Sequence, residues 1–233
     1  MTDAATPPAP GLRQRKKLQT RQLIAGTARR LFVERGFDGV TVAEIAREAE
    51  VSEQTVYNYF PTKEDLVYWQ LGDFEEKLLA ALRDRPPGEP ALAAFRRFLL
   101  SQQGLLGRVD EAARRQLTAI TRVIAESPAL LAREHEILAG YTASLASLLA
   151  AESGAAPDDA QAWAAAHAMM GVHRTLIQHT RRRILEGATH AGLARDVRAR
   201  AERAFSLLEH GLGGYAVAPA AGETTRPARM SGA

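Results

Sequence analysis

The sequence contains no cysteine in 233 residues, which excludes disulfides, thiolate metal sites and cysteine nucleophiles together. It also lacks a run of about 18 uncharged apolar residues, so we expect no membrane span. The first residues show no apolar signal-peptide core, which makes secretion unexpected. A reducing cytoplasm is therefore the simplest compartment for this chain.

Motifs for catalysis and metal binding are also missing. The sequence has no GxSxG, P-loop or GxGxxG pattern, and no two histidines lie three or four positions apart, as a helical metal site requires. The six histidines are His135, His167, His173, His179, His190 and His210. An enzyme, the main alternative from another functional class, has no motif to support it. We expect no catalytic residue, no metal site and no cofactor.

Positive charge is concentrated near the N-terminus. The whole chain carries a net charge of +3, yet the segment Arg13–Arg35 holds eight Lys or Arg and one acid, Glu34, a local net charge of +7. A basic end on a near-neutral chain favours an anionic polymer as partner. The alternative is an ordinary solvated helix face, and charge alone does not separate the two.

Helical periodicity covers most of the chain. Hydrophobic residues make up 46% of it, enough for a sizeable core, and no alternation typical of strands occurs. Apolar residues recur at helical spacing, and Gly and Pro separate the periodic segments. We therefore predict an all-α fold of about nine helices, namely Leu18–Arg35, a second helix from Thr41, Ser52–Phe60, Thr62–Arg83, Pro90–Leu106, Glu111–Glu126, Ala129–Ala151, Asp158–Glu186 and Leu193–Leu212.

Capping signals define the first helices. Gly36 suits the left-handed position that follows a helix. Thr41 and Glu44 have the spacing of a capping box, in which each side chain bonds the other's backbone amide. Ser52 and Thr62 are good N-caps for the third and fourth helices.

The second and third helices are too short to be stable alone, so they must pack on each other and on the first helix. In this helix-turn-helix arrangement, Val56 and Phe60 of the third helix face inward. Its outer face carries side chains that bond base edges or phosphates, namely Gln54, Thr55, Tyr57, Asn58 and Tyr59. Lys63, in the first turn of the next helix, adds a cation and a free amide that suit a phosphate of a nucleic-acid backbone.

The run TARRLFVERGFDGVTVAEIAREAEVSEQTVYNYFPTKEDLV, Thr27–Val67, resembles the DNA-binding head of the TetR family of bacterial repressors. The resemblance implies DNA contacts by Thr41, Ser52, Gln54, Thr55, Tyr57, Tyr59 and Lys63. One position departs from the family pattern, because Glu50 stands in the turn where Gly is usual. A positive φ at Glu costs about 1 kcal/mol, so the turn is expected to be strained or slightly different.

The resemblance also implies a domain organisation and a small-molecule site in the C-terminal part. The expected divisions are a disordered arm (1–12), a helix-turn-helix domain (13–63), a connecting helix (64–84), a ligand-binding and dimerisation domain (85–212) and a flexible tail (213–233). Candidate ligand-binding residues are Phe98, Gln102, Tyr141, Trp163, His167, Met170 and Arg174. The last four fall on one helical row, for which an ordinary core face is the alternative.

The last helix carries an apolar stripe on an otherwise charged surface, formed by Val197, Ala201, Ala204, Phe205 and Leu208. Paired with the preceding helix, this stripe predicts a four-helix homodimer, with intrachain core as the alternative. A two-fold dimer matches a palindromic operator in double-stranded DNA. We expect a repressor that a small, largely apolar effector releases from DNA. A ligand-independent regulator or an activator of the same fold remains the alternative.

Overall fold

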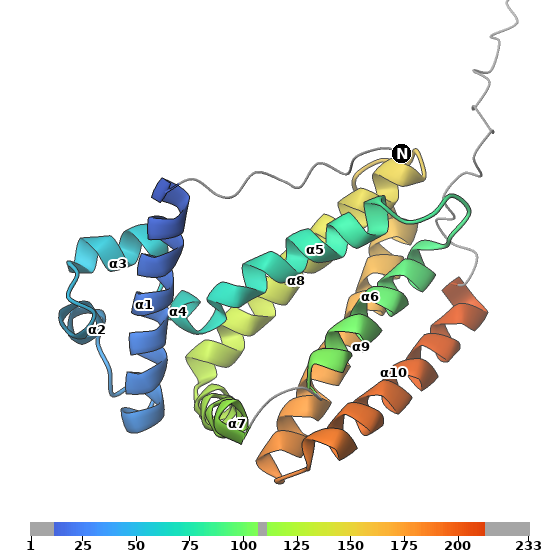
Figure 1. Ribbon diagram of the computed structural model, residues 1–233. Coiled ribbons are helices and arrows are strands. Elements are labelled where there is room, and N and C mark those ends of the chain that lie inside the picture. Colours follow the sequence, from blue (N-terminus) through green and yellow to red (C-terminus); the bar gives the residue numbers. More distant parts are fainter. Residues whose placement is uncertain (1–11, 107–110, 213–233) are drawn as a thin grey trace, which may run out of the picture. The chain divides into compact units, whose positions relative to one another are not determined.

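The computed structural model describes residues 12–106 and 111–212, and no strand occurs in these two ranges. They form ten α-helices and one 3₁₀ helix (Figure 1): α1 Leu12–Arg35, α2 Val42–Glu48, α3 Glu53–Tyr59, α4 Asp65–Tyr68, η1 Trp69–Leu71, α5 Gly72–Arg83, α6 Ala91–Leu106, α7 Glu111–Glu126, α8 Pro128–Glu152, α9 Ala160–Leu185 and α10 His190–Leu212. The expected all-α class is confirmed. The predicted arm, apart from Leu12, and the predicted tail lie outside the described residues.

The chain divides into two compact units. The first comprises Met1–Gly72 with Arg115–Glu134, and the second comprises Asp73–Arg114 with His135–Ala233. The division along the chain thus falls between η1 and the body of α5, and again within α7 and α8. The predicted functional divisions at residues 63 and 84 remain predictions.

The core of the first unit is formed by the inner faces of α1, α2 and α3. Ile24, Phe32, Ile45 and Phe60 are fully or almost fully buried. The ring centroids of Phe32 and Phe37 lie 5.0 Å apart, so the loop between α1 and α2 packs its Phe37 against this core. Burying each such side chain contributes about 1.5–3 kcal/mol, so two short helices become stable only as part of this unit.

Helix α1 begins six residues earlier than periodicity predicts. Its first turns carry exposed side chains from Arg13 to Gln19, of which only Leu18 is apolar, so no apolar stripe marks them in the sequence. The basic residues at the start of the Arg13–Arg35 segment are therefore helical and solvated, and are not part of an irregular arm.

The fourth predicted helix, Thr62–Arg83, is not continuous. Helix α4 begins at Asp65, lasts one turn and gives way to the 3₁₀ turn η1 before α5 starts at Gly72. Thr62 lies ahead of α4, where its hydroxyl accepts the Asp65 amide (3.3 Å) and its own amide donates to the Asp65 carboxylate (3.1 Å). The prediction of one connecting helix is wrong, since apolar spacing does not distinguish a 3₁₀ turn from an α-helical one.

Helix α4 is held by the other segment of the first unit. The hydroxyl of Tyr68 donates to the carbonyl of Leu130 (2.9 Å), and Arg133 pairs with Asp65 (2.9 Å). The segment just after α3 is thereby fixed to the first turns of α8.

In the second unit α10 packs against both α6 and α9 (Figure 1). The rings of Phe95 and Phe205 meet at 6.0 Å between α6 and α10. Arg85 is buried after α5 and forms a paired ion bridge to Glu152 (2.6 and 2.8 Å). None of the described helices has the length and apolarity needed to cross a bilayer.

Candidate functional site

Helix α3 is divided into an inner and an outer face. Val56 and Phe60 are buried, as predicted, and anchor the helix in the first unit. Tyr57 on the opposite face is 46% exposed, one of the few large apolar side chains left in solvent. Ser52, Gln54 and Asn58 are also exposed, whereas Thr55 and Tyr59 are half-buried. The structure thus brings the predicted polar side chains together on one accessible helix face.

Three local hydrogen bonds order this face. The Gln54 amide donates to the Asn58 side-chain carbonyl (3.1 Å), one turn further along α3. Ser52 caps the helix by accepting the Thr55 amide (3.1 Å), and the two hydroxyls are 2.8 Å apart. Each amide side chain keeps further donors and acceptors, which is what recognition of a base edge requires.

The turn before α3 keeps a left-handed backbone at Glu50, with φ 53°. Among the described residues it is the one non-glycine with positive φ. The turn geometry expected for Gly is therefore retained, and Glu50 adopts it at the cost argued above.

Thr41 and Glu44 form the predicted capping box at the start of α2. Both the amide and the hydroxyl of Thr41 donate to the Glu44 carboxylate, at 2.8 and 2.9 Å. These bonds, together with Arg35 at 3.0 Å, lower the pKa of Glu44 to about 2. Because both donors of Thr41 are already engaged, a contact from its hydroxyl to DNA would have to replace the bond to Glu44.

Lys63 lies half-buried against the head rather than extended into solvent. Its ammonium donates to the carbonyl of Phe37 (2.7 Å) and sits 4.1 Å from the centroid of that ring. Desolvation lowers its pKa from the ordinary value. An ammonium has three N–H donors. The predicted phosphate contact therefore remains geometrically open beside this structural one.

Sequence reasoning missed Arg21 as a residue that positions α3. Its guanidinium lies 5.6 Å from the centroid of Phe60 at the end of α3 and 5.7 Å from that of Trp69. Both rings are far away in the sequence, so no local pattern could have indicated the contact.

The predicted ligand-binding residues do not gather at one place in the second unit. His167, Met170 and Arg174 line a groove of about 110 Å³ between α8 and α9. Trp163 is not part of it and donates its indole N–H to the carbonyl of Pro157 (3.1 Å). A groove this small is below the range of about 300–1,000 Å³ typical of ligand sites.

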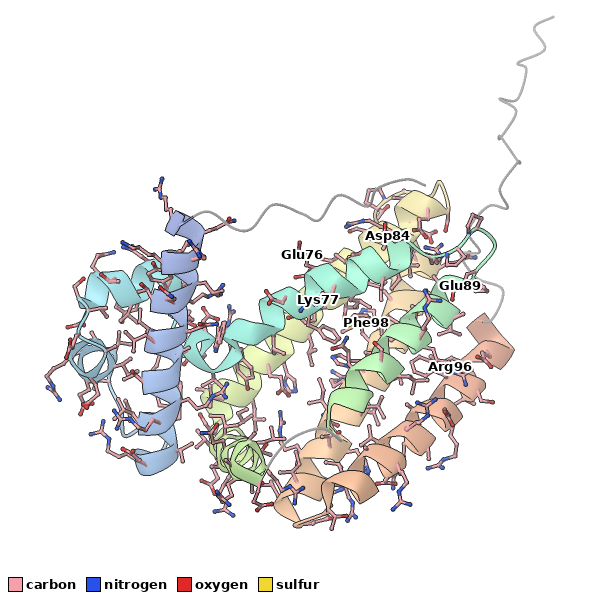
Figure 2. All side chains as sticks on the ribbon, in the orientation of Figure 1. Glu76, Lys77, Asp84, Glu89, Arg96 and Phe98 are labelled. Atoms are coloured by element: carbon pink, nitrogen blue, oxygen red, sulfur yellow. The ribbon has the colours of Figure 1, made fainter. Side chains whose placement is uncertain are left out.

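Phe98 and Tyr141 instead belong to a cluster of rings centred on Phe74 of α5. The Phe74 centroid lies 5.3 Å from that of Phe98, which Figure 2 labels on α6, and 5.8 Å from that of Tyr141 on α8. It also stacks on His173 of α9 at 4.6 Å and 9°. Gln102, half-buried, lies one turn after Phe98 on α6. We call Phe74, Phe98, Tyr141 and His173 the aromatic cluster.

His173 carries an unsatisfied polar atom into this cluster. Its Nδ1 is buried and makes no hydrogen bond, and burial lowers the pKa of the ring to about 4. At neutral pH the ring is therefore neutral, and one nitrogen carries no proton. The sequence offered no signal for this role, since a lone histidine on a helix is most often an ordinary core residue.

The predicted dimer stripe on α10 needs correction. Val197, Ala201 and Phe205 have no exposed surface in the single chain, because α6 and α9 cover them. They cannot also contact a partner, so this part of the prediction is wrong. Ala204 and Leu208 are half-buried and remain candidates, while the neighbouring Leu207 is 76% exposed.

A three-helix head with a polar, accessible third helix behind a tight turn defines a helix-turn-helix DNA-binding protein. Residues 24–68 match the model for bacterial regulatory proteins of the tetR family. The HTH-type transcriptional regulator TcmR of Streptomyces glaucescens is 37% identical over 163 residues, which cover 66% of this chain and 70% of TcmR. The chain belongs to the TetR family and is a DNA-binding transcriptional regulator.

Other comparisons are shorter or more distant. The HTH-type transcriptional regulator HbdR of Aromatoleum sp. (strain CIB) is 40% identical over 53 residues, 23% of each chain. FadR of Bacillus subtilis, solved in complex with stearoyl-CoA, matches with a TM-score of 0.49 and 23% identity over 79% of this chain and 97% of its own. Across the ranges described by the structure, no three His, Asp or Glu side chains gather as metal ligands would.

Proposed function

We propose that this regulator is a dimeric repressor which a small, largely apolar molecule releases from a palindromic operator. One observation best supports recognition of a specific DNA sequence. Helix α3 is divided into a buried anchor, Val56 and Phe60, and an exposed polar face. Two such helices related by a two-fold axis fit half-sites about 34–36 Å apart.

Gln54, Tyr57 and Asn58 supply the specific contacts in this proposal. Gln and Asn amides bond two edge atoms of adenine at once, which is worth about 1–3 kcal/mol of discrimination per base. The Gln54–Asn58 hydrogen bond holds both amides on one helix face and reduces the entropy lost on binding. Exposed Arg13, Arg15 and the lysines beside them add sequence-independent attraction to phosphate.

Selection of bound fragments from genomic DNA, followed by footprinting, identifies the operator. With that operator, Tyr57→Ala and Gln54→Ala should each weaken binding about tenfold or more at about 0.15 M salt. Gln161→Ala, an exposed glutamine on α9, is the matched control and should bind as wild type does. Unchanged affinity in both α3 variants, with the fold intact by circular dichroism, would contradict the assignment of α3.

We place the effector at the aromatic cluster. A buried acceptor without a partner costs about 1–3 kcal/mol, and a ligand that donates a hydrogen bond to His173 Nδ1 would remove that cost. Stacked rings around the same nitrogen suit a flat apolar body. Tyr141 and Phe98 provide the flanking surfaces.

The position of the aromatic cluster suggests how ligand binding there affects the DNA-binding helices. Phe74 is the third residue of α5, immediately after the 3₁₀ turn η1. Tyr141 lies on α8, whose first turns hold α4 through Leu130 and Arg133. A ligand that displaces the Phe74 ring would move the start of α5 and bias both connections. By linkage, such a ligand binds the DNA complex less tightly than the free protein.

A thermal-shift screen of a metabolite and drug library against wild type and His173→Phe tests the effector site. Compounds that stabilise wild type should weaken operator binding at least about fivefold, and His173→Phe should lose most of the response. A library without any stabilising compound would favour the ligand-independent regulator. Transcription from a reporter placed behind the operator separates repression from activation.

A further inference from the structure

A groove in the first unit serves neither the DNA face nor the effector site. It has a volume of about 560 Å³ and lies between α1 and the early part of α7, with Trp69 of η1 at its side. Seven residues of α1 line it, and among them Gln22, Gly26, Arg29 and Val33 follow one another at helical spacing. Its volume is within the range of about 300–1,000 Å³ that small-molecule sites occupy.

The lining of this α1–α7 groove is mostly apolar. Trp69 and Val33 provide the large surfaces, and Ala25 and Ala119 provide small ones. Val33 is left exposed on α1 although it is apolar, and Gly26 offers a bare stretch of helix. An added Cβ at Gly26 would meet no atom within 4 Å, so the space beside it is open. Such a surface gains free energy when an apolar body covers it.

The edges of the groove are positively charged. Arg29, Arg30 and Arg115 line it, against a single acid, Glu34. Arg30 is shared between Glu34 (3.4 Å) and Glu48 (3.3 Å), so its charge is already balanced. Arg29 makes no ion pair or hydrogen bond within the ranges that the structure describes. Its guanidinium is therefore available to an anion, while Arg115 lines the other side of the groove.

We propose that the α1–α7 groove binds a small molecule with a flat apolar body and one carboxylate head group. The body covers Trp69 and Val33, and the carboxylate pairs with Arg29. The complementarity of charge selects an anion over a neutral analogue of the same shape. A bound molecule joins α1 to α7 and stabilises the first unit by linkage.

A matched pair of probes tests this proposal: 4-butylbenzoate, and 4-butylbenzyl alcohol, which lacks the charge. The chain has only two tryptophans, so Trp163→Phe leaves Trp69 as the single reporter. We expect 4-butylbenzoate to shift the fluorescence emission maximum of Trp69. Its binding should also be measurable by isothermal titration calorimetry. The alcohol should bind at least about tenfold more weakly, because the loss of a charge-assisted pair is worth about that factor.

Two substitutions at Gly26 form the structural control. Gly26→Phe fills the groove from an exposed helix position, so it should fold and weaken binding of 4-butylbenzoate at least about tenfold. Gly26→Ala leaves the groove open and should bind within about twofold of wild type. Arg29→Gln should reduce affinity for the anion and not for the alcohol.

The proposal would be overturned by the absence of 4-butylbenzoate binding at millimolar concentration, by equal binding of both probes, or by wild-type affinity in Gly26→Phe. His173→Phe should leave the affinity for 4-butylbenzoate unchanged. Loss of 4-butylbenzoate binding in His173→Phe would place the probe at the aromatic cluster instead, and would also contradict the α1–α7 groove.

Discussion

Glu50 shows how one residue can be held in a conformation that its side chain disfavours. It occupies the position after the end of α2, where its amide bonds the Arg47 carbonyl (3.2 Å) and the Val51 amide bonds that of Ala46 (2.9 Å). This is the Schellman pattern, for which Gly is the usual residue. The two hydrogen bonds and the packing of α2 and α3 fix the backbone, so Glu50 bears the strain of φ 53°.

Replacing Glu50 with glycine should therefore stabilise the protein. We expect Glu50→Gly to raise the free energy of unfolding by about 1 kcal/mol, measured by urea denaturation. Glu53→Gly makes the same change at the first residue of α3, where φ is helical, and should lower it by about 0.5–1 kcal/mol. If Glu50→Gly lowers stability, the left-handed turn is not strained.

The contacts of a single residue could be predicted where its partner lies nearby in the sequence and not where the partner is distant. Thr41 and Glu44 lie three positions apart, so the capping box follows from sequence alone. Lys63 bonds a carbonyl 26 positions earlier, and no spacing rule indicates that contact. His173, whose Nδ1 is buried, stacks on Phe74 of another helix far away in the sequence, which is why its role emerged only from the structure.

At the scale of helices, the capping box of α2 should make stability depend on pH. The pKa of Glu44 falls from its ordinary value of 4.5 to about 2 in the folded protein, chiefly through the bond from the Thr41 amide. A carboxyl group with a lowered folded pKa stabilises fully above its unfolded pKa and loses that effect as pH falls towards its folded pKa. The contribution of Glu44 should therefore disappear between about pH 4.5 and pH 2.

Glu44→Gln isolates this effect, because glutamine keeps the acceptor of a capping box and removes the charge. Urea midpoints should differ most between wild type and Glu44→Gln above pH 5, with wild type more stable, and should converge as the pH approaches 2. A constant difference across this range would show that the charge of Glu44 has no part in the stability of α2.

Helix α10 illustrates what periodicity leaves open. The spacing of Val197, Ala201 and Phe205 indicates a buried face, and these residues are buried. The pattern does not say whether the same chain or a second one covers that face. Since α6 and α9 cover it, Phe205→Ala should cost about 3–5 kcal/mol in unfolding free energy. Leu207→Ala should cost less than about 0.5 kcal/mol at protein concentrations where the chain is monomeric. Equal costs would contradict the burial pattern.

At the scale of the whole molecule, the chain passes between the two units at the start of α5, within α7 and within α8, and only the first of these places was predicted as a connector. The sequence indicated the approximate position of the described helices but neither the first turns of α1 nor the break at η1, where apolar spacing is similar on both sides. The break separates α4, which Leu130 and Arg133 hold, from α5, which carries Phe74. A signal from the aromatic cluster to α3 would pass along the chain at this point, which periodicity alone does not reveal.

The final prediction concerns the proposed dimer, for which Leu207 is the most accessible large apolar side chain among the described residues, at 76% exposure. Leu207→Glu should dissociate the dimer, since a two-fold contact would bring two buried carboxylates together. Light scattering gives the mass, and Leu23→Glu, at an exposed leucine of α1, is the control that should leave it unchanged. Operator affinity should fall at least about a hundredfold while affinity for a single half-site stays the same. A Leu207→Glu protein that remains dimeric would place the contact between subunits elsewhere.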